Sequence, residues 1–295
     1  YQPNNGGLTK NSIAVGTVQD NETPDASAPV MVKVGGNNFS CGVFQDGRVK
    51  CWGEPTYAQL GYPAANFGDE TSEAADQVSA LNLGTGFNAV QVVSGWGANN
   101  GYSCALSNVG TVKCWGDGSG YGVLGNGATG TYYGAYPNTM GDAMPLVNLN
   151  DTATSIYGGN GFACAILTGG VKCWGGNSSG QLGYGDTNNR GDAANEMGAS
   201  LPYVNFGTGR TVTQLSVGAH HSCAILDNGA LKCWGSNTYG QLGYGDTNHR
   251  GDAANEMGDF LPAINLGTGR TAKAVSVGYL VTCAQLDNDM VKCWG

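Results

Sequence analysis

The residues of this chain best suited to chemistry are its cysteines. Ten cysteines form five pairs, spaced nine or ten residues apart, and Trp-Gly follows each second member. The pairs are Cys41 with Cys51, Cys104 with Cys114, Cys164 with Cys173, Cys223 with Cys233, and Cys283 with Cys293. Matched pairs favour disulfides in an oxidising compartment. Buried free thiols are an alternative, and a zinc site is another, although zinc prefers closer Cys-x2–4-Cys spacing.

His220 and His221 are a second candidate, as a metal-binding or catalytic pair. No Ser or Cys nucleophile with an orienting carboxylate accompanies them, so the sequence favours a structural role. His249 replaces Asn189 in a copied loop, which indicates a surface residue. No spacing supports paired catalytic carboxylates. We therefore predict no catalytic residue, no cofactor and no metal.

Two copied loops, at 186–196 and 246–256, resemble a calcium-binding loop. The possible oxygen ligands in the first copy are Asp186, Asn188, Asp192 and Glu196. However, Arg190 stands where a calcium loop needs a ligand, and the closing Glu comes one residue early. We expect Arg190 to bind loop carbonyls or a nearby acid instead. Both loops contain Arg-Gly-Asp, which we attribute to duplication rather than to adhesion.

The cysteine pairs must be positioned by β-hairpins, because apolar residues alternate on both sides of Asp227-Asn228-Gly229. A three-residue loop there would place Cys223 opposite Cys233, with its third residue left-handed, as in a type I turn with a G1 bulge. The residues at that loop position are Gly47, Gly110, Gly229 and, in the last hairpin, Asp289. The third hairpin is one residue shorter, with the loop Thr168-Gly169, and its cysteine spacing is shorter by one as well. This covariation favours cross-strand pairing.

The tryptophans that follow the cysteine pairs recur at spacings of 63, 59, 60 and 60 residues, which indicates a repeat architecture. Within 175–235 we expect four strands, at Leu201–Phe206, Val212–Val217, Ser222–Leu226 and Leu231–Trp234. The hairpin is apolar on both faces, as in a sheet packed between two others. The sequence therefore predicts an all-β propeller of four-stranded antiparallel blades, with about five blades in this chain. The residues expected to fill the space between blades are Trp52, Trp115, Trp174, Trp234 and Trp294.

We interpret the whole chain, 1–295, as one domain. The approximate repeats are 1–53, 54–116, 117–175, 176–235 and 236–295. Ile13–Val18 and Pro29–Val34 are expected to supply strands that lead into the first hairpin. An insertion between Gly116 and Pro145 is expected to be an extended loop with surface tyrosines at Tyr121, Tyr132, Tyr133 and Tyr136. Glycosylation sequons occur at Asn21, Asn38, Asn150 and Asn177, at a frequency that chance explains.

Two segments carry a resemblance to a known family. WGSNTYGQLGYGD at 234–246 and GAHHSCAILDNGALKCWG at 218–235 resemble the regulator of chromosome condensation repeat. This resemblance implies a β-propeller, usually seven-bladed, whose members mostly bind proteins, and it implies that His221 is the family's structural His. The family includes a nuclear nucleotide-exchange factor and a secreted β-lactamase inhibitor protein. This chain differs in its paired cysteines, which suit secretion and not a reducing nucleus, and in having only five hairpin units.

Composition excludes several classes of partner. The net charge is −9 with only 12% charged residues and no basic cluster, so nucleic-acid binding is not expected. No apolar run reaches the roughly 18 residues of a membrane span. We predict a non-catalytic protein-binding or structural module that is secreted, extracellular or at the cell surface, with a protein partner or self-association, and with a glycan as a further possible ligand. The alternatives are a subunit of an extracellular fibre or surface assembly and a glycan-active propeller enzyme.

The ends of the sequence lead to a further expectation. The chain begins at Tyr1 without a signal peptide, which indicates a mature or trimmed product, and it stops at Gly295 directly after a Cys-Trp-Gly unit. Either the N-terminal strands complete a small ring with the last hairpin, or the chain is part of a larger propeller or fibre. The second option predicts self-association of the isolated chain, because an open blade face is a large apolar patch.

Overall fold

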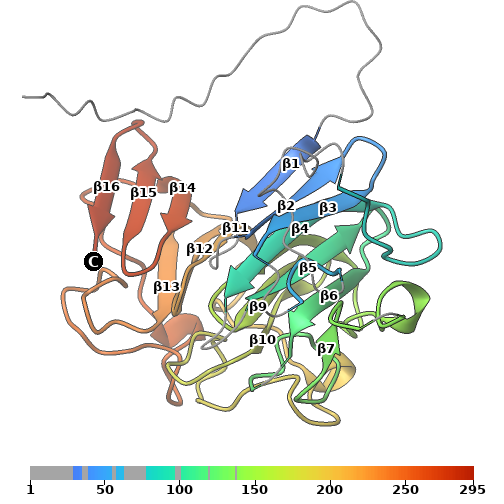
Figure 1. Cartoon of the computed structure of the whole chain (residues 1–295). Helices are drawn as coiled ribbons and strands as arrows, with labels where there is room; N and C mark the ends of the chain where they lie inside the picture. The colour runs from blue at the N-terminus through green and yellow to red at the C-terminus, as the bar shows by residue number, and fades with distance from the viewer. Residues whose placement is uncertain are drawn as a thin grey trace, which may run out of the picture.

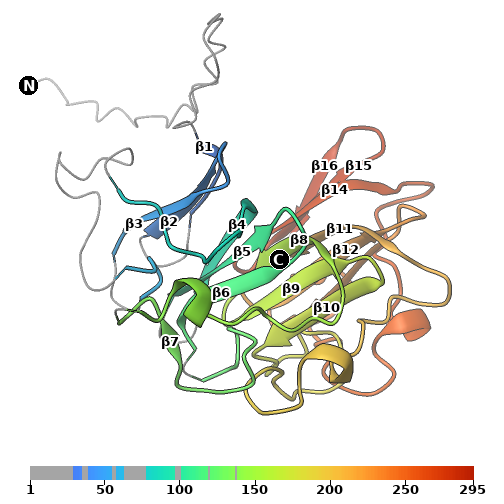
Figure 2. The same ribbon diagram turned by 90° about the vertical axis from the view of Figure 1, so that its right-hand side faces the viewer.

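Five antiparallel sheets follow one another along the chain and are arranged side by side in an arc (Figures 1 and 2). This computed structural model describes residues 29–34, 39–54, 58–62, 78–96, 101–118, 120–136 and 138–295. The strand expected at Ile13–Val18 lies outside these residues. The described residues contain three short 3-10 turns, at Gly141–Ala143, Gly198–Ser200 and Gly258–Phe260, and no α-helix. The prediction of an all-β propeller is confirmed.

Each sheet is a meander of consecutive strands. The first is β1 (Pro29–Val34), β2 (Phe39–Phe44) and β3 (Val49–Gly53); the second is β4 (Ala89–Trp96), β5 (Gly101–Ser107), β6 (Val112–Asp117) and β7 (Tyr132–Tyr133). The third is β8 (Ala153–Gly158), β9 (Phe162–Leu167) and β10 (Gly170–Gly175); the fourth is β11 (Val212–Val217), β12 (His221–Leu226) and β13 (Leu231–Gly235); the fifth is β14 (Ala272–Val277), β15 (Thr282–Leu286) and β16 (Val291–Trp294). The first strands β1, β4, β8, β11 and β14 contact one another in chain order and form the inner side of the arc.

The hydrophobic core is divided into four clusters, one between each pair of neighbouring sheets. This arrangement explains why the hairpins are apolar on both faces: every residue of β12 and β13 is buried. Trp115, Trp174 and Trp234 are 0% exposed, whereas Trp52 and Trp294 are half-buried. The Nε1 atom of Trp234 donates a hydrogen bond at 3.0 Å to the carbonyl oxygen of Gln181, in the loop that precedes its own sheet. The indoles therefore join successive repeats by packing and by hydrogen bonding.

The hairpins follow the predicted register. Cys223 lies opposite Cys233, and Ile225 lies opposite Leu231. The third loop residues have positive φ angles, for instance 76° at Gly229 and 64° at Asp289, because the bulge requires the left-handed region. In the shorter third hairpin, Gly170 pairs with Leu167, so that two residues form the loop. The spacing of the cysteines thus predicted the loop length and the strand register of the hairpins.

All ten cysteines are joined in disulfides, each within one hairpin, with Cα atoms 4.0–4.1 Å apart. Eight of them are at most 2% exposed, whereas Cys283 is half-buried and Cys293 is exposed. No free cysteine occurs in the described part of the chain, which includes every cysteine of the sequence.

The expectation of a strand at Leu201–Phe206 was wrong. This segment is extended but forms no ladder, and it makes a single hydrogen bond to the preceding hairpin, from Val204 N to Val171 O at 2.8 Å. Pro202 lacks an N–H, and the Asn205 side chain accepts from Gly207 N, so neither residue supports regular pairing. Four of the sheets consequently have three strands instead of four.

The insertion in the second repeat is not wholly a loop, because Tyr132–Tyr133 forms β7 and pairs with β6. Tyr121, Tyr132 and Tyr136 are exposed by 37%, 36% and 66%, and Tyr133 is half-buried. No helix of the described residues is long and apolar enough to cross a membrane.

Candidate functional site

The two ends of the arc differ in chemical character, and the difference follows from strand order. At one end of the arc, the first strand of each sheet ends and the second strand begins. The third strand of each sheet also ends there, and the loops that lead on to the next sheets begin there. We call this end the aromatic face and define it by residues 96, 118, 120–124, 159–161, 176–182, 218–220, 236–242 and 278–281. No Asp, Glu, Lys or Arg occurs in these segments. The opposite end carries the hairpin turns, and we call it the charged face.

Four side chains from four different sheets meet on the aromatic face. The rings of Trp96, from the second sheet, and Tyr279, from the fifth, are stacked with centroids 6.4 Å apart and planes 15° apart. His220 meets the same tyrosine edge-on, at 6.2 Å. The Asn160 amide donates to the Trp96 carbonyl oxygen at 2.9 Å and accepts from Trp96 Nε1 at 3.3 Å. Asn160 also lies 3.3 Å from Nε2 of His220, so the cluster closes across the inner side of the arc.

The exposure of this cluster is graded. Trp96, Asn160 and His220 are half-buried, whereas 57% of Tyr279 is exposed. Burial lowers the pKa of His220 below its ordinary value, which keeps the imidazole neutral at physiological pH. Two further tyrosines, Tyr121 and Tyr239, stand on the loops that follow the third strands and are 37% and 62% exposed. The segments that define the face are therefore aromatic and contain no Asp, Glu, Lys or Arg, and the charged loop at 186–196 borders them, with Asp186 accepting a hydrogen bond from the Asn177 amide at 3.2 Å.

The charged face has its ions arranged in pairs. The pairs are Arg48 with Asp46, Arg210 with Asp227, Arg270 with Asp287, and Lys273 with Asp289. Each links residues of one turn or of adjacent turns near the protein surface. Exposed pairs of this kind contribute little stability, and they leave few charges without a counterion.

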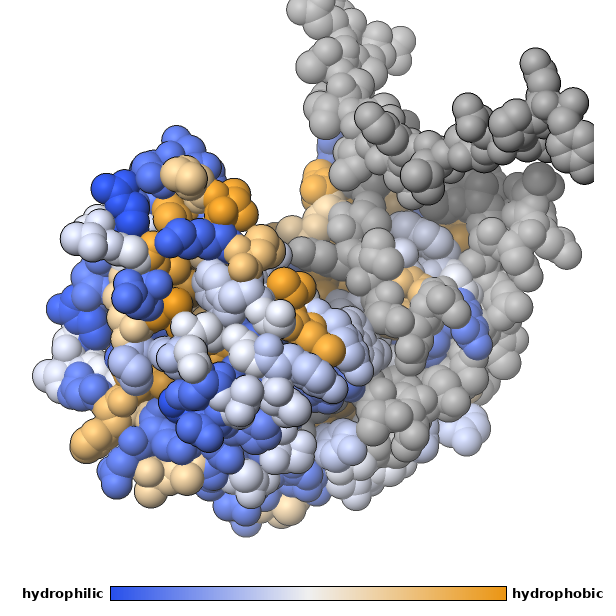
Figure 3. All heavy atoms as spheres, turned by 90° about the vertical axis from the view of Figure 1, so that its left-hand side faces the viewer, coloured by the Kyte–Doolittle hydropathy of each residue, from blue (hydrophilic) through white to orange (hydrophobic). Residues whose placement is uncertain are grey.

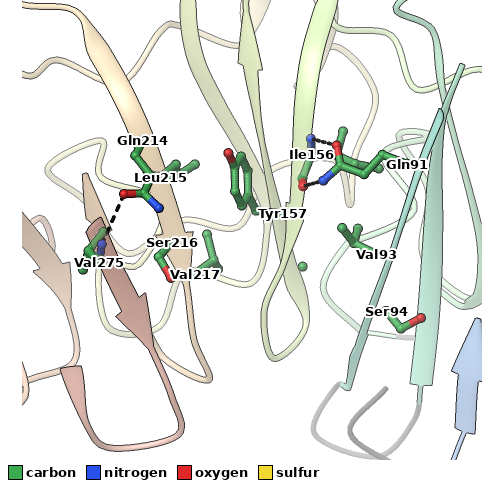
Figure 4. Close-up of a pocket in the computed structure, with 11 residues that line it drawn as sticks. Gln91, Val93, Ser94, Ile156, Tyr157, Gln214, Leu215, Ser216, Val217 and Val275 are labelled. Carbon is green, nitrogen blue, oxygen red and sulfur yellow. Dashed lines mark hydrogen bonds between the residues drawn. The ribbon is translucent and has the colours of Figure 1, made fainter. Parts of the chain in front are cut away.

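A cavity of about 260 Å³ runs along the inner strands (Figure 4). Its polar side chains are used to join neighbouring sheets. The Gln91 side-chain amide donates to Ile156 O at 2.7 Å and accepts from Ile156 N at 2.9 Å. One sheet further, Gln214 accepts from Val275 N at 3.2 Å. The described residues that line the cavity include no Asp, Glu, His, Lys or Arg, and burial raises the pKa of the Tyr157 phenol, which also lines it.

His221 occupies the structural position expected from the sequence. It is fully buried, and its Nε2 atom lies 2.8 Å from the hydroxyl oxygen of Thr282 in the next sheet. Tyr102, at the equivalent position of the second sheet, likewise reaches the third sheet and donates to Gly159 O at 3.2 Å. In these two hairpins, the residue two positions before the first cysteine thus links its own sheet to the next one.

The copied loops at 186–196 and 246–256 are held by their own side chains. Arg190 donates to the carbonyl oxygens of Asn188 and Asn189 at 2.8 and 3.1 Å and pairs with Asp186 at 2.7 Å. Glu196 accepts from the backbone N–H groups of three successive loop residues, 191–193. The predicted role of the arginine is confirmed. No cluster of three His, Cys, Asp or Glu side chains suited to a metal occurs in the described residues. Within the first Arg-Gly-Asp sequence Gly191 is buried, and the Arg190 guanidinium is paired with Asp186.

Sequence reasoning missed two groups of residues. The aromatic cluster had no repeating signal, because Trp96, Asn160 and Tyr279 differ in type from sheet to sheet. The Lys before each second cysteine is one charge per hairpin in the sequence, and its role is visible only in the structure: Lys232 is 8% exposed and donates to Phe206 O and Gly258 O at 2.9 and 2.7 Å. Lys172 makes the same two contacts in the preceding repeat. The recurrence of a lysine directly before every second cysteine was the sequence signal that could have revealed this buried role.

Three regions of the chain match sequence profiles of the Regulator of chromosome condensation (RCC1) repeat: residues 34–59, 168–225 and 212–241. The human E3 ubiquitin-protein ligase HERC2 is 29% identical over 72% of this chain, which spans 4% of that protein. The ultraviolet-B receptor UVR8 of Arabidopsis thaliana is 28% identical over 79% of this chain, which spans 48% of the receptor.

Solved structures agree on the fold. Human WBSCR16 superimposes with a TM-score of 0.61 at 20% identity over 88% of this chain and 57% of that one. Yeast RCC1 (Prp20), solved bound to Kap60, superimposes with a TM-score of 0.60 at 18% identity over 88% of this chain and 54% of that one. The chain thus spans roughly half the length of these propellers. Its residues 34–59, 168–225 and 212–241 match the regulator of chromosome condensation repeat, and its fold is similar to that of these β-propellers.

Proposed function

We propose that this chain of regulator of chromosome condensation repeats is a non-catalytic protein-binding module, secreted or held at the cell surface, and that the aromatic face contacts the partner. The observation that carries the proposal is the contrast between the two faces. One presents Tyr121, Tyr239 and Tyr279 from segments that contain no Asp, Glu, Lys or Arg. Tyrosine and tryptophan are enriched at protein interfaces and at the residues that dominate binding energy, while charges are depleted from interface cores.

The rigidity of the face supports this assignment. Trp96 and Tyr279 stack between two sheets, and Asn160 is hydrogen-bonded to the same tryptophan. Rings that are already held in place lose little conformational entropy when a partner binds them. A relative of the same fold, yeast Prp20p, was solved in work that describes its binding to Gsp1p and histones. Protein binding is therefore a use to which this fold is put.

The compartment is proposed from the disulfides. Five disulfides in one chain are stable in an oxidising environment and rare in the cytosol or nucleus. An exchange factor for a nuclear GTPase is accordingly not the function we favour. A glycan-active enzyme is disfavoured as well, because the inner cavity has no acidic or basic side chain among its described lining residues.

The test is capture of a partner from the native extracellular fraction, followed by affinity measurement with the purified partner. Tyr239→Ser and Tyr279→Ala install the residues that the preceding repeat has at Ser179 and Ala219, so the fold should tolerate both. We expect each to weaken binding by about five- to thirtyfold, as for an interface aromatic worth about 1–2 kcal/mol.

Lys273→Gln is the matched control, because Lys273 is 57% exposed and lies on the charged face. It should leave affinity unchanged. If Lys273→Gln abolishes binding of the partner while both tyrosine variants still bind it, the aromatic face is not the interface.

A further inference from the structure

Two copied segments of successive repeats differ at three exposed positions. Two of these differences introduce an aromatic ring, and the third places Asp259 where the other copy has Ala199. In the segments 196–205 and 256–265, Tyr203 corresponds to Ala263, and Phe260 corresponds to Ser200. Tyr203 is 44% exposed and Phe260 is 69% exposed. Burial explains neither substitution, since a mostly exposed ring adds little to the core.

The two rings border the same cavity. It has a volume of about 480 Å³, lies outside the aromatic face, and is enclosed by the loop at 183–190 and the 3-10 turn at Gly258–Phe260 of the next repeat. This volume is within the range of small-molecule sites. Because the aromatic residues come from two different repeats, only the packing of one repeat on the next brings them to one place.

Tyr203 is held in a fixed orientation. Its hydroxyl donates to Asp151 at 2.9 Å, and the Lys172 ammonium lies 4.9 Å from the ring centroid. A Cβ atom on Gly169 would lie 2.6 Å from the Tyr203 hydroxyl oxygen, and one on Gly170 would lie 3.1 Å from its ring. The short third hairpin therefore makes room for this tyrosine, and the ring is preorganised for a ligand.

The charges at this cavity neutralise each other. Arg190 pairs with Asp186 at 2.7 Å and stacks on the ring of Tyr184, with its guanidinium carbon 5.3 Å from the centroid. The Tyr184 hydroxyl donates to Cys173 O at 2.9 Å. The exposed amides of Asn205 and Asn255 also border the cavity. The lining thus combines aromatic rings with neutral groups that donate and accept hydrogen bonds.

From this lining we infer that the cavity between the fourth and fifth repeats binds a neutral saccharide. A pyranose ring has an apolar face of C–H groups that packs on an aromatic ring, and a rim of hydroxyls that donate and accept hydrogen bonds. Tyr203 and Phe260 supply aromatic surface, and the asparagine amides supply both kinds of hydrogen bond. An ionic ligand would meet only the paired Arg190 and Asp186, and a purely apolar ligand would remove polar amide groups from water without offering them hydrogen bonds.

The experiment is an NMR titration of the full chain with neutral sugars: glucose, galactose, mannose, xylose, N-acetylglucosamine and their β-linked disaccharides. Each is added up to about 10 mM, so that a Kd in the millimolar range is still detectable. At least one sugar should shift the signals of Tyr203 and Phe260 saturably. Tyr203→Ala and Phe260→Ser install the residues of the neighbouring repeat, so each should remain folded. We expect each to weaken binding at least tenfold, and the double variant to abolish it.

Tyr239→Ser is the control, since this exposed tyrosine lies on the aromatic face. This variant should leave the affinity for sugar unchanged while it lowers the affinity for the protein partner. Failure of the saccharide inference can therefore be distinguished from failure of the proposed protein-binding function. The inference is overturned if no sugar shifts these signals, if the double variant binds sugar as the wild type does, or if an anionic sugar binds and its neutral parent does not. Loss of the protein partner in Phe260→Ser, with no sugar binding, would instead assign the cavity to a protein interface.

Discussion

His221 and Thr282 connect the fourth and fifth sheets through a hydrogen bond whose direction is determined by its surroundings. The Thr282 hydroxyl donates to Gln241 O at 2.8 Å, so its oxygen accepts from Nε2 of His221, also at 2.8 Å. The imidazole is therefore protonated on Nε2, and the buried Nδ1 has no hydrogen-bond partner among the described residues. A second proton on Nδ1 would be a buried charge without a counterion.

This geometry predicts acid sensitivity. Burial, together with the nearby His220, lowers the pKa of His221 from 6.5 to about 4. Between these values the unfolded chain binds a proton that the folded chain does not, so stability decreases as pH falls from 6.5 towards 4 and is constant above. The contribution is at most about 3 kcal/mol. Urea unfolding at several pH values should show a shallower dependence for His221→Phe, which copies Phe162. Equal slopes in both proteins would contradict the buried neutral imidazole.

Trp234→Ala should destabilise the protein by about 3–5 kcal/mol, because it empties a fully buried site between two sheets. Trp234→Phe should cost less, since most of the ring volume remains while the hydrogen bond to Gln181 O is lost. Denaturant midpoints measure both effects. A near-neutral alanine variant would mean that the indole is not part of the interblade core and would make the tryptophans candidates for a ligand platform.

Lys232→Met should cost about 1–3 kcal/mol, because it leaves two buried carbonyl oxygens, of Phe206 and Gly258, without their donor. The same substitution at Lys273, which is 57% exposed, should change stability by less than about 0.5 kcal/mol. Thermal unfolding of the two variants side by side makes the comparison. Similar effects at both positions would show that the recurrent lysine is an ordinary surface charge.

The five disulfides should differ in accessibility. Limited reduction followed by alkylation should label Cys283 and Cys293 first, since the other eight cysteines are at most 2% exposed. Non-reducing peptide mapping should find only links within hairpins. Each link closes a loop of about ten residues, so removing one pair should cost about 2–3 kcal/mol by the loop-entropy model. A link between repeats, or early labelling of Cys223, would contradict this arrangement.

Calcium should not stabilise the protein. The Arg190 guanidinium already binds the loop carbonyls and Asp186 in the space that a cation would need. We expect the unfolding temperature to be the same with calcium and with a chelator. A saturable rise with calcium would contradict this prediction, and Arg190→Ala would then show whether the arginine competes with the ion.

Much of the fold was determined by local sequence. The turn residues, the alternation of apolar side chains and the equal change of loop length and cysteine spacing in the third hairpin specified the hairpins and their register, because turn type and the two-residue period of a strand are local properties. Leu201–Phe206 also looked like a strand locally. Pro202 and the side-chain bond of Asn205 reduced it to a single hydrogen bond with the previous hairpin.

The candidate sites were decided by tertiary structure alone. Trp96 and Tyr279 are separated by three sheet boundaries in the sequence, and Tyr203 and Phe260 belong to different repeats, so no periodic pattern relates the members of either pair. The buried lysines do recur in the sequence, but the acceptors of Lys232, the carbonyl oxygens of Phe206 and Gly258, each lie 26 residues away and are brought to it only by folding. Periodicity encodes which face of a strand is buried, but contacts between non-equivalent positions of successive repeats exist only once the sheets have packed around a common inner side.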